Sequence, residues 1–265
     1  MTPESLLQHY DNAQLWATAP SDAESFDVAH AYQQSLAVRA LRVARGEQPR
    51  GYKIGFTNRN IWPAYGVFAP IWGPVWDTTL IQCDGEGVVA LAGTCQPRLE
   101  PEAVFGLRAV PAAGASLDTL FDAIDWVAPG FEIVQSHLAG WKFRAADTVA
   151  DGALHARLLV GQRMAVRDIA TDAASLERAL ASASVTLHQG NQQVDQGRGA
   201  NVLDGPLHAL AHFINELRAC PGAADLKAGD VVTTGTWTDA WPVVSGQEWT
   251  ARFSSPLASL KVRFI

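Results

Sequence analysis

The segment from Pro97 to Leu107, PRLEPEAVFGL, constrains the fold of this chain most strongly. Its second half is apolar and rich in residues that favour strands, which predicts a strand entering a core. Because residues two apart on a strand point to the same face, Glu100 and Glu102 direct their carboxylates into one space. Buried like charges repel each other unless a shared proton or a cation compensates them. The alternative is a strand at a solvated edge, with both glutamates facing water.

A third acid, Glu132, lies in the equally apolar segment APGFEIV. Three carboxylates, with water completing the shell, suit Mg²⁺ or Mn²⁺ better than zinc, which prefers histidine and cysteine. Glu100, Glu102 and Glu132 are therefore candidate metal ligands.

The charge balance of the 265 residues argues against a nucleic-acid partner, because the formal net charge is -7. An acidic protein that binds an anionic substrate needs a local positive centre, and a divalent cation would supply one. Hydrophobic residues make up 48% and charged residues 18%, as in folded globular proteins.

The three cysteines lack CxxC spacing, which favours a reducing compartment over a disulfide framework. No leader and no apolar run of ~18 residues is evident, so we expect no membrane span and a cytoplasmic protein.

The periodicity of the sequence changes near residue 49. Residues 1–48 predict a helical N-terminal arm, with one helix starting at Thr2-Pro3-Glu4 and a second at Ser21-Asp22-Ala23-Glu24. Residues 49–265 predict a catalytic domain of many short strands, with helices at about Leu117–Val127 and Leu207–Arg218. This pattern indicates an α+β fold with a β-rich barrel or sandwich core and helices packed outside it.

Lys53 and the pair Gly235-Thr236 are candidate site residues. Lys53 lies between apolar residues in a predicted strand, where a buried ammonium becomes useful for proton transfer; the alternative is an edge lysine facing solvent. Gly235-Thr236 follows an apolar strand, and its backbone N–H groups and hydroxyl could hold a carboxylate or simply form a β-turn.

Other polar residues carry weaker signals. Lys142 could pair with a metal-ligating glutamate or with a substrate carboxylate, and Asp147 could support the ligands or cap a helix. Trp72 belongs to a tryptophan-rich segment that could wall an apolar substrate pocket, pack in the core or form a subunit interface. A stripe of His208, His212 and Glu216 on one predicted helix is typical of an exposed polar face.

Four segments occur in a specific order and spacing: GYKIGFT from Gly51, PRLEPE from Pro97, FEIV from Phe131 and WK-(4 residues)-DTVAD from Trp141. Together they resemble the 2-hydroxypenta-2,4-dienoate hydratase and 4-oxalocrotonate decarboxylase branch of the fumarylacetoacetate hydrolase superfamily. The resemblance runs from about Gly51 to the C-terminus. Two departures are Asn58, where a serine is usual, and the segment Asn60–Trp72, where aromatic residues and prolines replace a polar stretch.

The resemblance implies a mixed, barrel-like β core and Mg²⁺ or Mn²⁺ held by the three glutamates. It also implies that Lys53 and Lys142 line the substrate site and that Gly235-Thr236 receives the substrate carboxylate. Asp77 falls where related hydratases carry an acid, and is a candidate partner of Lys53 in proton transfer.

The implied activity is the metal-dependent addition of water to a 2-hydroxy-2,4-dienoate to give a 4-hydroxy-2-oxo acid, as in catabolic meta-cleavage pathways. Alternatives at the same site are decarboxylation of a vinylogous 2-oxo diacid and C–C hydrolysis of an acylpyruvate. A further alternative is a non-catalytic subunit that stabilises a partner enzyme. The resemblance also implies a homo-oligomer that could associate with a decarboxylase or an aldolase.

Overall fold

The computed structural model describes residues 1–112, 114 and 116–265. The strands are β1 (Pro49–Gly55), β2 (Ile71–Trp76), β3 (Leu80–Gln82), β4 (Glu86–Val89), β5 (Arg98–Leu107), β6 (Ile124–Val134), β7 (His155–Val160), β8 (Met164–Ala165), β9 (Ser184–Gln189), β10 (Gln192–Arg198), β11 (Val231–Thr236), β12 (Trp241–Pro242), β13 (Glu248–Phe253) and β14 (Leu260–Phe264). The α-helices are α1 (Pro3–Asp11), α2 (Val28–Ala44), α3 (Trp62–Tyr65), α4 (Leu117–Ala123), α5 (Ala145–Ala150), α6 (Val166–Ile169), α7 (Ala173–Ser182) and α8 (Pro206–Ala219). Short 3₁₀ turns are η1 (Pro20–Asp22), η2 (Arg59–Ile61), η3 (Ala139–Trp141), η4 (Gly152–Leu154) and η5 (Gly199–Asn201).

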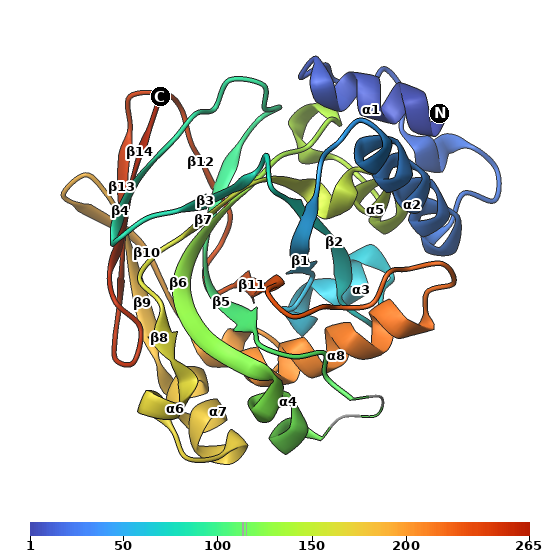
Figure 1. Ribbon diagram of the computed structural model, residues 1–265. Coiled ribbons are helices and arrows are strands. Elements are labelled where there is room, and N and C mark those ends of the chain that lie inside the picture. The colour runs from blue at the N-terminus through green and yellow to red at the C-terminus, as the bar shows by residue number, and fades with distance from the viewer. Residues whose placement is uncertain (113, 115) are drawn as a thin grey trace.

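A strongly curled mixed sheet forms the centre of the molecule (Figure 1). Among the described residues it has nine strands, with the main order β2-β1-β11-β5-β6-β7-β3. Strands β5 and β6 are the longest and pair antiparallel along most of their length. Their apolar residues are buried almost throughout, which explains why both segments form central strands rather than edges.

A second sheet and several helices close the core around this half-barrel. The second sheet has the order β10-β9-β13-β14-β4. Helix α8 packs against β11, with Leu210, Phe213 and Leu217 fully buried on one face at helical spacing. The predicted α+β fold with a β-rich, barrel-like core is therefore confirmed.

The N-terminal helices agree with the prediction at one start and differ at the other. Thr2 caps α1, because its hydroxyl accepts a hydrogen bond from Ser5 N. The predicted start at Ser21 is wrong: η1 is a single turn, and α2 begins at Val28 with the Asp27 carboxylate accepting from His30 N. Helix α2 packs against α5 of the remaining chain. The division into an arm of residues 1–48 and a domain of residues 49–265 stays a prediction.

Three further elements differ from expectation. The helix predicted for Leu117–Val127 ends at Ala123, because Ile124–Val134 pairs with β5 as a strand. Strand β2 lies in the tryptophan-rich segment, for which no strand was predicted, and all its residues are buried. Helix α7 was not predicted, although Asp172 caps it in the usual way.

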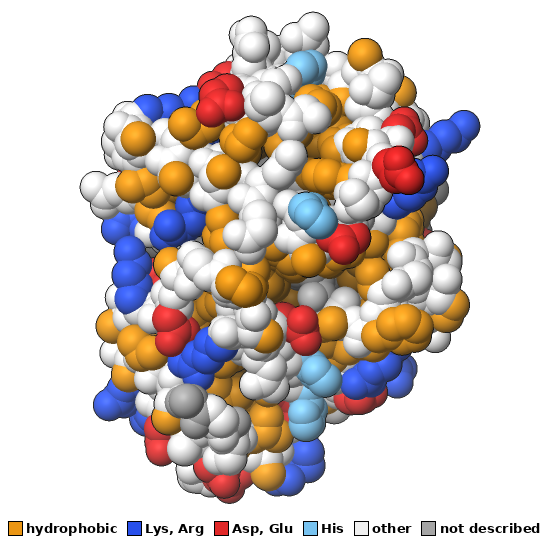
Figure 2. Space-filling view, turned by 90° about the vertical axis from the view of Figure 1, so that its right-hand side faces the viewer, with side chains coloured by type: hydrophobic (Ala, Val, Ile, Leu, Met, Phe, Trp, Pro, Cys, Tyr) orange, Lys and Arg blue, Asp and Glu red, His pale blue; other side chains and the backbone are white. Residues whose placement is uncertain are grey.

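Charged side chains of both signs occur on the surface (Figure 2). On the face that carries α1 and α2, basic and acidic side chains are interspersed (Figure 2). Across the described ranges, no helix combines the length and apolar character that crossing a bilayer requires.

Candidate metal centre and substrate cavity

Pairing between β5 and β6 brings the three glutamates together. Glu100 and Glu102 lie on the same face of β5, and Glu132 of β6 is directly opposite Glu100 in the register. One carboxylate oxygen from each residue lies within 4.8 Å of the others. Glu102 and Glu132 are fully buried, so the solvated-edge alternative does not hold for them.

Lys53 is the positive group of this cluster. Strand β11 lies between β1, which carries Lys53, and β5. Lys53 Nζ lies 3.0 Å from Glu132 Oε2, and its side chain is almost completely buried. Burial opposes the ammonium form, but Glu132, Glu100 and Glu102 outweigh it and raise the pKa of Lys53. Lys53 is therefore a buried, positively charged member of the cluster rather than an edge lysine facing solvent.

His155, at the start of β7, fixes the orientation of Glu132. Its Nδ1 lies 2.9 Å from Glu132 Oε1, and its Nε2 lies 2.9 Å from Thr79 Oγ1. Burial lowers the pKa of His155, so the neutral ring donates to Glu132 and accepts from the threonine hydroxyl. The sequence analysis did not single out His155; the available signal was its position directly before the stretch Ala156–Val160, whose composition is typical of a strand.

The donor set fits a hard divalent cation. Glu102 Oε1 is buried without a hydrogen-bond partner among the described residues, while Oε2 accepts from Gly235 N at 2.8 Å. Burial and the charge of Glu132 raise the pKa of Glu100 to about 7, and burial together with both other glutamates raises that of Glu102 well above its usual range. Three ionised carboxylates would exceed the single charge of Lys53, so a cation of charge +2 would balance the site.

We expect Mg²⁺ affinity to fall as the pH decreases from 8 to 6. The raised pKa values mean that Glu100 and Glu102 hold protons near neutral pH, and a metal ion must displace these protons to bind. Calorimetric titration at several pH values, in buffers of different ionisation enthalpy, measures both the affinity and the released protons. An affinity that stays constant over this range would contradict the expectation.

Lys53 and Glu100 line a cavity of about 430 Å³, which gives a small molecule access to the cluster. Gly235 and Thr236 also line it. The Gly235 N–H donates to Glu102, and the Thr236 hydroxyl donates to Thr238 O, so both groups are engaged within the protein. Their role in holding a substrate carboxylate stays a prediction.

We expect Gly235→Ala to lower both stability and metal affinity. Gly235 has φ +98°, and a Cβ there would lie 1.9 Å from Thr57 Oγ1. The backbone would have to shift and move its N–H away from Glu102, at a cost of about 1–3 kcal/mol in free energy of unfolding. Gly246→Ala is the control, because Gly246 also has positive φ but faces open space. Chemical denaturation measures the stability of both variants, and Mg²⁺ titration measures their metal affinity. Equal losses of stability and affinity in the two variants would contradict the steric explanation.

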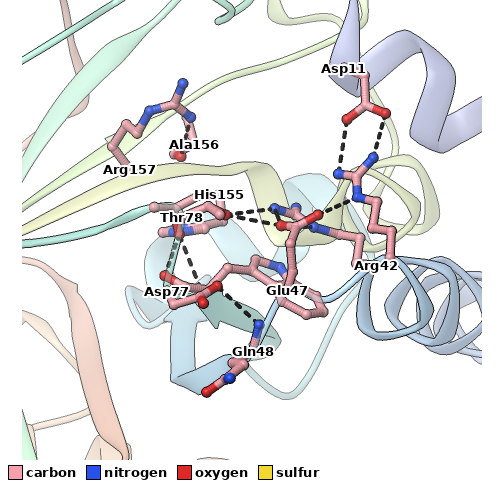
Figure 3. A network of polar contacts seen from close by, with 12 residues as sticks. Asp11, Arg42, Glu47, Gln48, Asp77, Thr78, His155, Ala156 and Arg157 are labelled. Atoms are coloured by element: carbon pink, nitrogen blue, oxygen red, sulfur yellow. Dashed lines mark hydrogen bonds and ion pairs between the residues drawn. The ribbon is translucent and has the colours of Figure 1, made fainter.

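Two predicted site residues lie away from the cavity lining. Asp77 is exposed, and its carboxylate accepts a hydrogen bond from Gln48 N at 3.0 Å (Figure 3). Lys142 is also exposed, although its neighbours Trp141 and Phe143 line the cavity. The structure does not bring either residue to the glutamates.

Asp147 and Trp72 have structural contacts instead. The Asp147 carboxylate accepts from Ser21 N, Ser21 Oγ and Arg144 N, which caps α5 and attaches η1 to it. The Trp72 ring is buried and stacks on Tyr32, with centroids 4.6 Å apart. Of the alternatives for these residues, helix capping and core packing describe the observed contacts.

Several cavity residues were missed by the sequence analysis. They are polar or aromatic side chains from segments far apart in the sequence, which periodicity cannot connect: Phe56, Tyr65, Arg98, Trp141, Phe143, Asp195, Asn201 and Asp239. For Arg98, the signal was its position two residues before Glu100 on the same strand face.

Comparison with known proteins identifies the family. No protein-family model matches the chain. The chain is 32% identical over 248 residues to the 2-hydroxyhexa-2,4-dienoate hydratase of Comamonas testosteroni, covering 93% of this chain and 90% of the relative. It is 30% identical over 266 residues to the 4-oxalocrotonate decarboxylase of Pseudomonas sp. strain CF600, covering 98% of this chain and 96% of the relative. The chain belongs to the hydratase and decarboxylase branch of the fumarylacetoacetate hydrolase superfamily.

Solved structures agree with membership in this superfamily. The 4-oxalocrotonate decarboxylase from Pseudomonas putida G7, complexed with magnesium and adipate, superposes with a TM-score of 0.88 at 28% identity, covering 99% of this chain and 95% of that chain. The fumarylpyruvate hydrolase from Pseudomonas aeruginosa shares the fold, with a TM-score of 0.61 at 14% identity, covering 82% of this chain and 89% of that chain.

Proposed function

We propose that this chain is a Mg²⁺- or Mn²⁺-dependent hydro-lyase that converts a 2-hydroxy-2,4-dienoate to a 4-hydroxy-2-oxo acid. The observation that carries the proposal is the cluster of three glutamates and Lys53 at a cavity of about 430 Å³. Relatives named as dienoate hydratases support the reaction type, and the magnesium in the decarboxylase structure supports the metal.

Glu100, Glu102 and Glu132 would hold the metal ion. When bound, the ion supplies Lewis-acid stabilisation of negative charge that develops on the substrate oxygens. The protein orients these ligands through Gly235 N–H, which binds Glu102, and through His155, which binds Glu132.

Lys53 is placed to move the proton of the first step. The dienol loses its 2-hydroxyl proton and gains a proton at C5, which gives the conjugated 2-oxo-3-enoate. Water then adds its oxygen to C4 and a proton to C3. Because Asp77 does not line the cavity, we assign this proton transfer to Lys53 without it.

Decarboxylation of a vinylogous 2-oxo diacid is the second candidate function. It is favoured by the coverage of the decarboxylase relative, 98% of this chain, and by the structural agreement with the decarboxylase from P. putida G7. Both reactions use a 2-oxo acid at one metal site. Acylpyruvate hydrolysis and a non-catalytic role remain weaker alternatives.

The deciding experiment measures loss of dienol absorbance from freshly made 2-hydroxypenta-2,4-dienoate with and without Mg²⁺ or Mn²⁺, alongside CO₂ release from 2-oxohex-3-enedioate. Metal-dependent loss of the dienol without CO₂ supports the hydratase. Release of CO₂ from the diacid identifies a decarboxylase. Turnover by the isolated chain would exclude a purely non-catalytic subunit.

We further propose that the chain forms a homo-oligomer and can associate with a decarboxylase or aldolase, as the family resemblance implies. Mass measurement in solution by light scattering tests the first of these, and co-purification with such an enzyme tests the second.

A further inference from the structure

Four aromatic rings form one continuous surface on the cavity. Phe56, Tyr65, Phe143 and Trp141, the aromatic wall, all line the cavity and are all partly exposed. The Phe56 and Tyr65 rings stack with centroids 4.8 Å apart, and Tyr65 and Phe143 stack at 5.8 Å. The Phe143 and Trp141 rings are tilted to each other, with centroids 5.9 Å apart. Three separate segments contribute these rings: the chain after β1, helix α3 and the chain at and after η3.

The end of the wall at Trp141 is held firmly in place. The indole Nε1 donates to Gln96 O at 3.0 Å, and the Arg98 guanidinium carbon lies 4.2 Å from the ring centroid. This cation–π contact engages the face of the ring and one side of Arg98. Trp141 is therefore fixed within the aromatic wall, and covering this apolar surface with a ligand is favourable because apolar area leaves water.

Part of the cavity lining is polar and acidic. Asp195, Asp239, Gln196 and Asn201 form this part. The Asp195 carboxylate accepts hydrogen bonds from Asp239 N and from Trp241 Nε1. A second carboxylate on a substrate would share the cavity with the carboxylates of Asp195 and Asp239, so Arg98 alone is a poor basis for diacid recognition.

The cavity is also larger than a five-carbon acid requires. Its volume is about 430 Å³, within the range of pockets that bind drug-sized ligands. 2-Hydroxypenta-2,4-dienoate has only eight non-hydrogen atoms, and its functional groups would occupy the end near Lys53 and Glu100. Such a molecule would leave most of the aromatic wall uncovered.

We propose that the aromatic wall binds the substrate tail, and that the chain acts on 2-hydroxy-2,4-dienoates that carry an apolar, ring-sized group at C5. This inference rests on the proposed function for its reaction and on the wall for its specificity. The hydration is the same as for the shorter acid: C5 gains a proton during ketonisation, and water adds its oxygen to C4 and a proton to C3. The C5 substituent takes no part in bond making.

The test compares three dienoates with the Mg²⁺-loaded protein: the unsubstituted acid, its 5-phenyl derivative and its 5-carboxy derivative. We expect kcat/KM for the phenyl compound to exceed the other two by at least ~10-fold, the scale of a well-formed aromatic contact. A preference for the unsubstituted acid or for the diacid would overturn the proposal.

Substitutions in the wall make the test specific. Tyr65→Ala should lower the ratio of phenyl to unsubstituted kcat/KM by about 10-fold, whereas Tyr65→Phe, which keeps the ring, should preserve it. The matched control is Phe68→Ala, because Phe68 lies in the same loop region but is 84% exposed and outside the cavity lining. An unchanged ratio in Tyr65→Ala would contradict the assignment.

A binding measurement separates the failure of this proposal from failure of the hydratase proposal. Calorimetric titration with the unreactive acids 2-oxo-5-phenylpentanoate and 2-oxopentanoate reports tail recognition without turnover. Tighter binding of the phenyl acid without hydration of any dienoate would support tail recognition by the aromatic wall and contradict the proposed hydratase activity. Hydration of the five-carbon dienoate, together with equal binding of both inert acids, would support the hydratase activity and contradict tail recognition by the aromatic wall.

Discussion

Replacement of Lys53 by methionine is expected to slow turnover by at least ~10²-fold, the usual contribution of a positioned proton-transfer group. Lys53 Nζ is the basic group that lies among the carboxylates, 3.0 Å from Glu132 Oε2. Methionine keeps the length and apolar character of the buried side chain but carries no proton. The measurement is steady-state loss of dienol absorbance at saturating Mg²⁺.

Metal binding should survive this change, and that result separates proton transfer from simple damage to the site. The three glutamates remain, and removing a positive charge from their centre leaves a more negative site that attracts a cation at least as strongly. Lys53→Arg is informative as well, because arginine keeps the charge but cannot release its proton near neutral pH. A slow Arg variant and a slow Met variant together indicate proton transfer, whereas an active Arg variant would indicate a purely electrostatic role.

Lys261→Met is the matched control for Lys53→Met. Lys261 is a partly exposed lysine on β14 that pairs with Glu86 and Glu248 at the surface. Its loss should leave turnover unchanged. Turnover unchanged in Lys53→Met would remove Lys53 from the reaction.

Replacement of Glu102 by glutamine is expected to weaken Mg²⁺ affinity by about 100-fold or more and to lower activity with it. Groups that only support a metal ligand already contribute 10- to 100-fold to affinity, and Glu102 is assigned as a ligand. Its Oε1 is a buried oxygen without a hydrogen-bond partner in the described residues, as a metal ligand would be. Calorimetry measures the affinity.

Thermal unfolding distinguishes loss of a ligand from misfolding in this variant. Mg²⁺ that binds the folded protein should raise Tm in the wild type, and Glu102→Gln should abolish that rise. Without metal, the variant should be at least as stable as the wild type, because burial and its neighbours raise the pKa of Glu102 and its charge is unfavourable there. Normal affinity and activity in the variant would exclude Glu102 from the metal ligands.

Glu177→Gln provides the control for a buried glutamate outside the cluster. Glu177 is 8% exposed, and its Oε2 accepts from Leu207 N at the start of α8. This substitution is expected to change stability without changing Mg²⁺ affinity. A comparable loss of affinity would mean that any buried glutamate affects the site indirectly.

The local pattern of the sequence was sufficient to predict the strand β5 and the shared face of its two glutamates, whose role as metal ligands stays a prediction. Glu100 and Glu102 share a face because a strand has a period of two, and this holds wherever the strand lies. The apolar setting of Glu132 indicated that its carboxylate would be buried. The α+β core, the cap at Thr2 and the bounds of β5 followed from the same short-range rules.

Pairing between distant segments decided which residues lie together in the cluster and the cavity. The sequence contains no signal that Glu132 pairs opposite Glu100, that β11 separates Lys53 from β5, or that His155 contacts Glu132 across 23 residues. For the same reason Asp77 and Lys142, which lie near site motifs in sequence, face outward, while Phe56, Tyr65 and Phe143 meet in one wall. Side-chain direction along one strand is a local property, but neighbours across strands depend on sheet order and register, which the whole core determines.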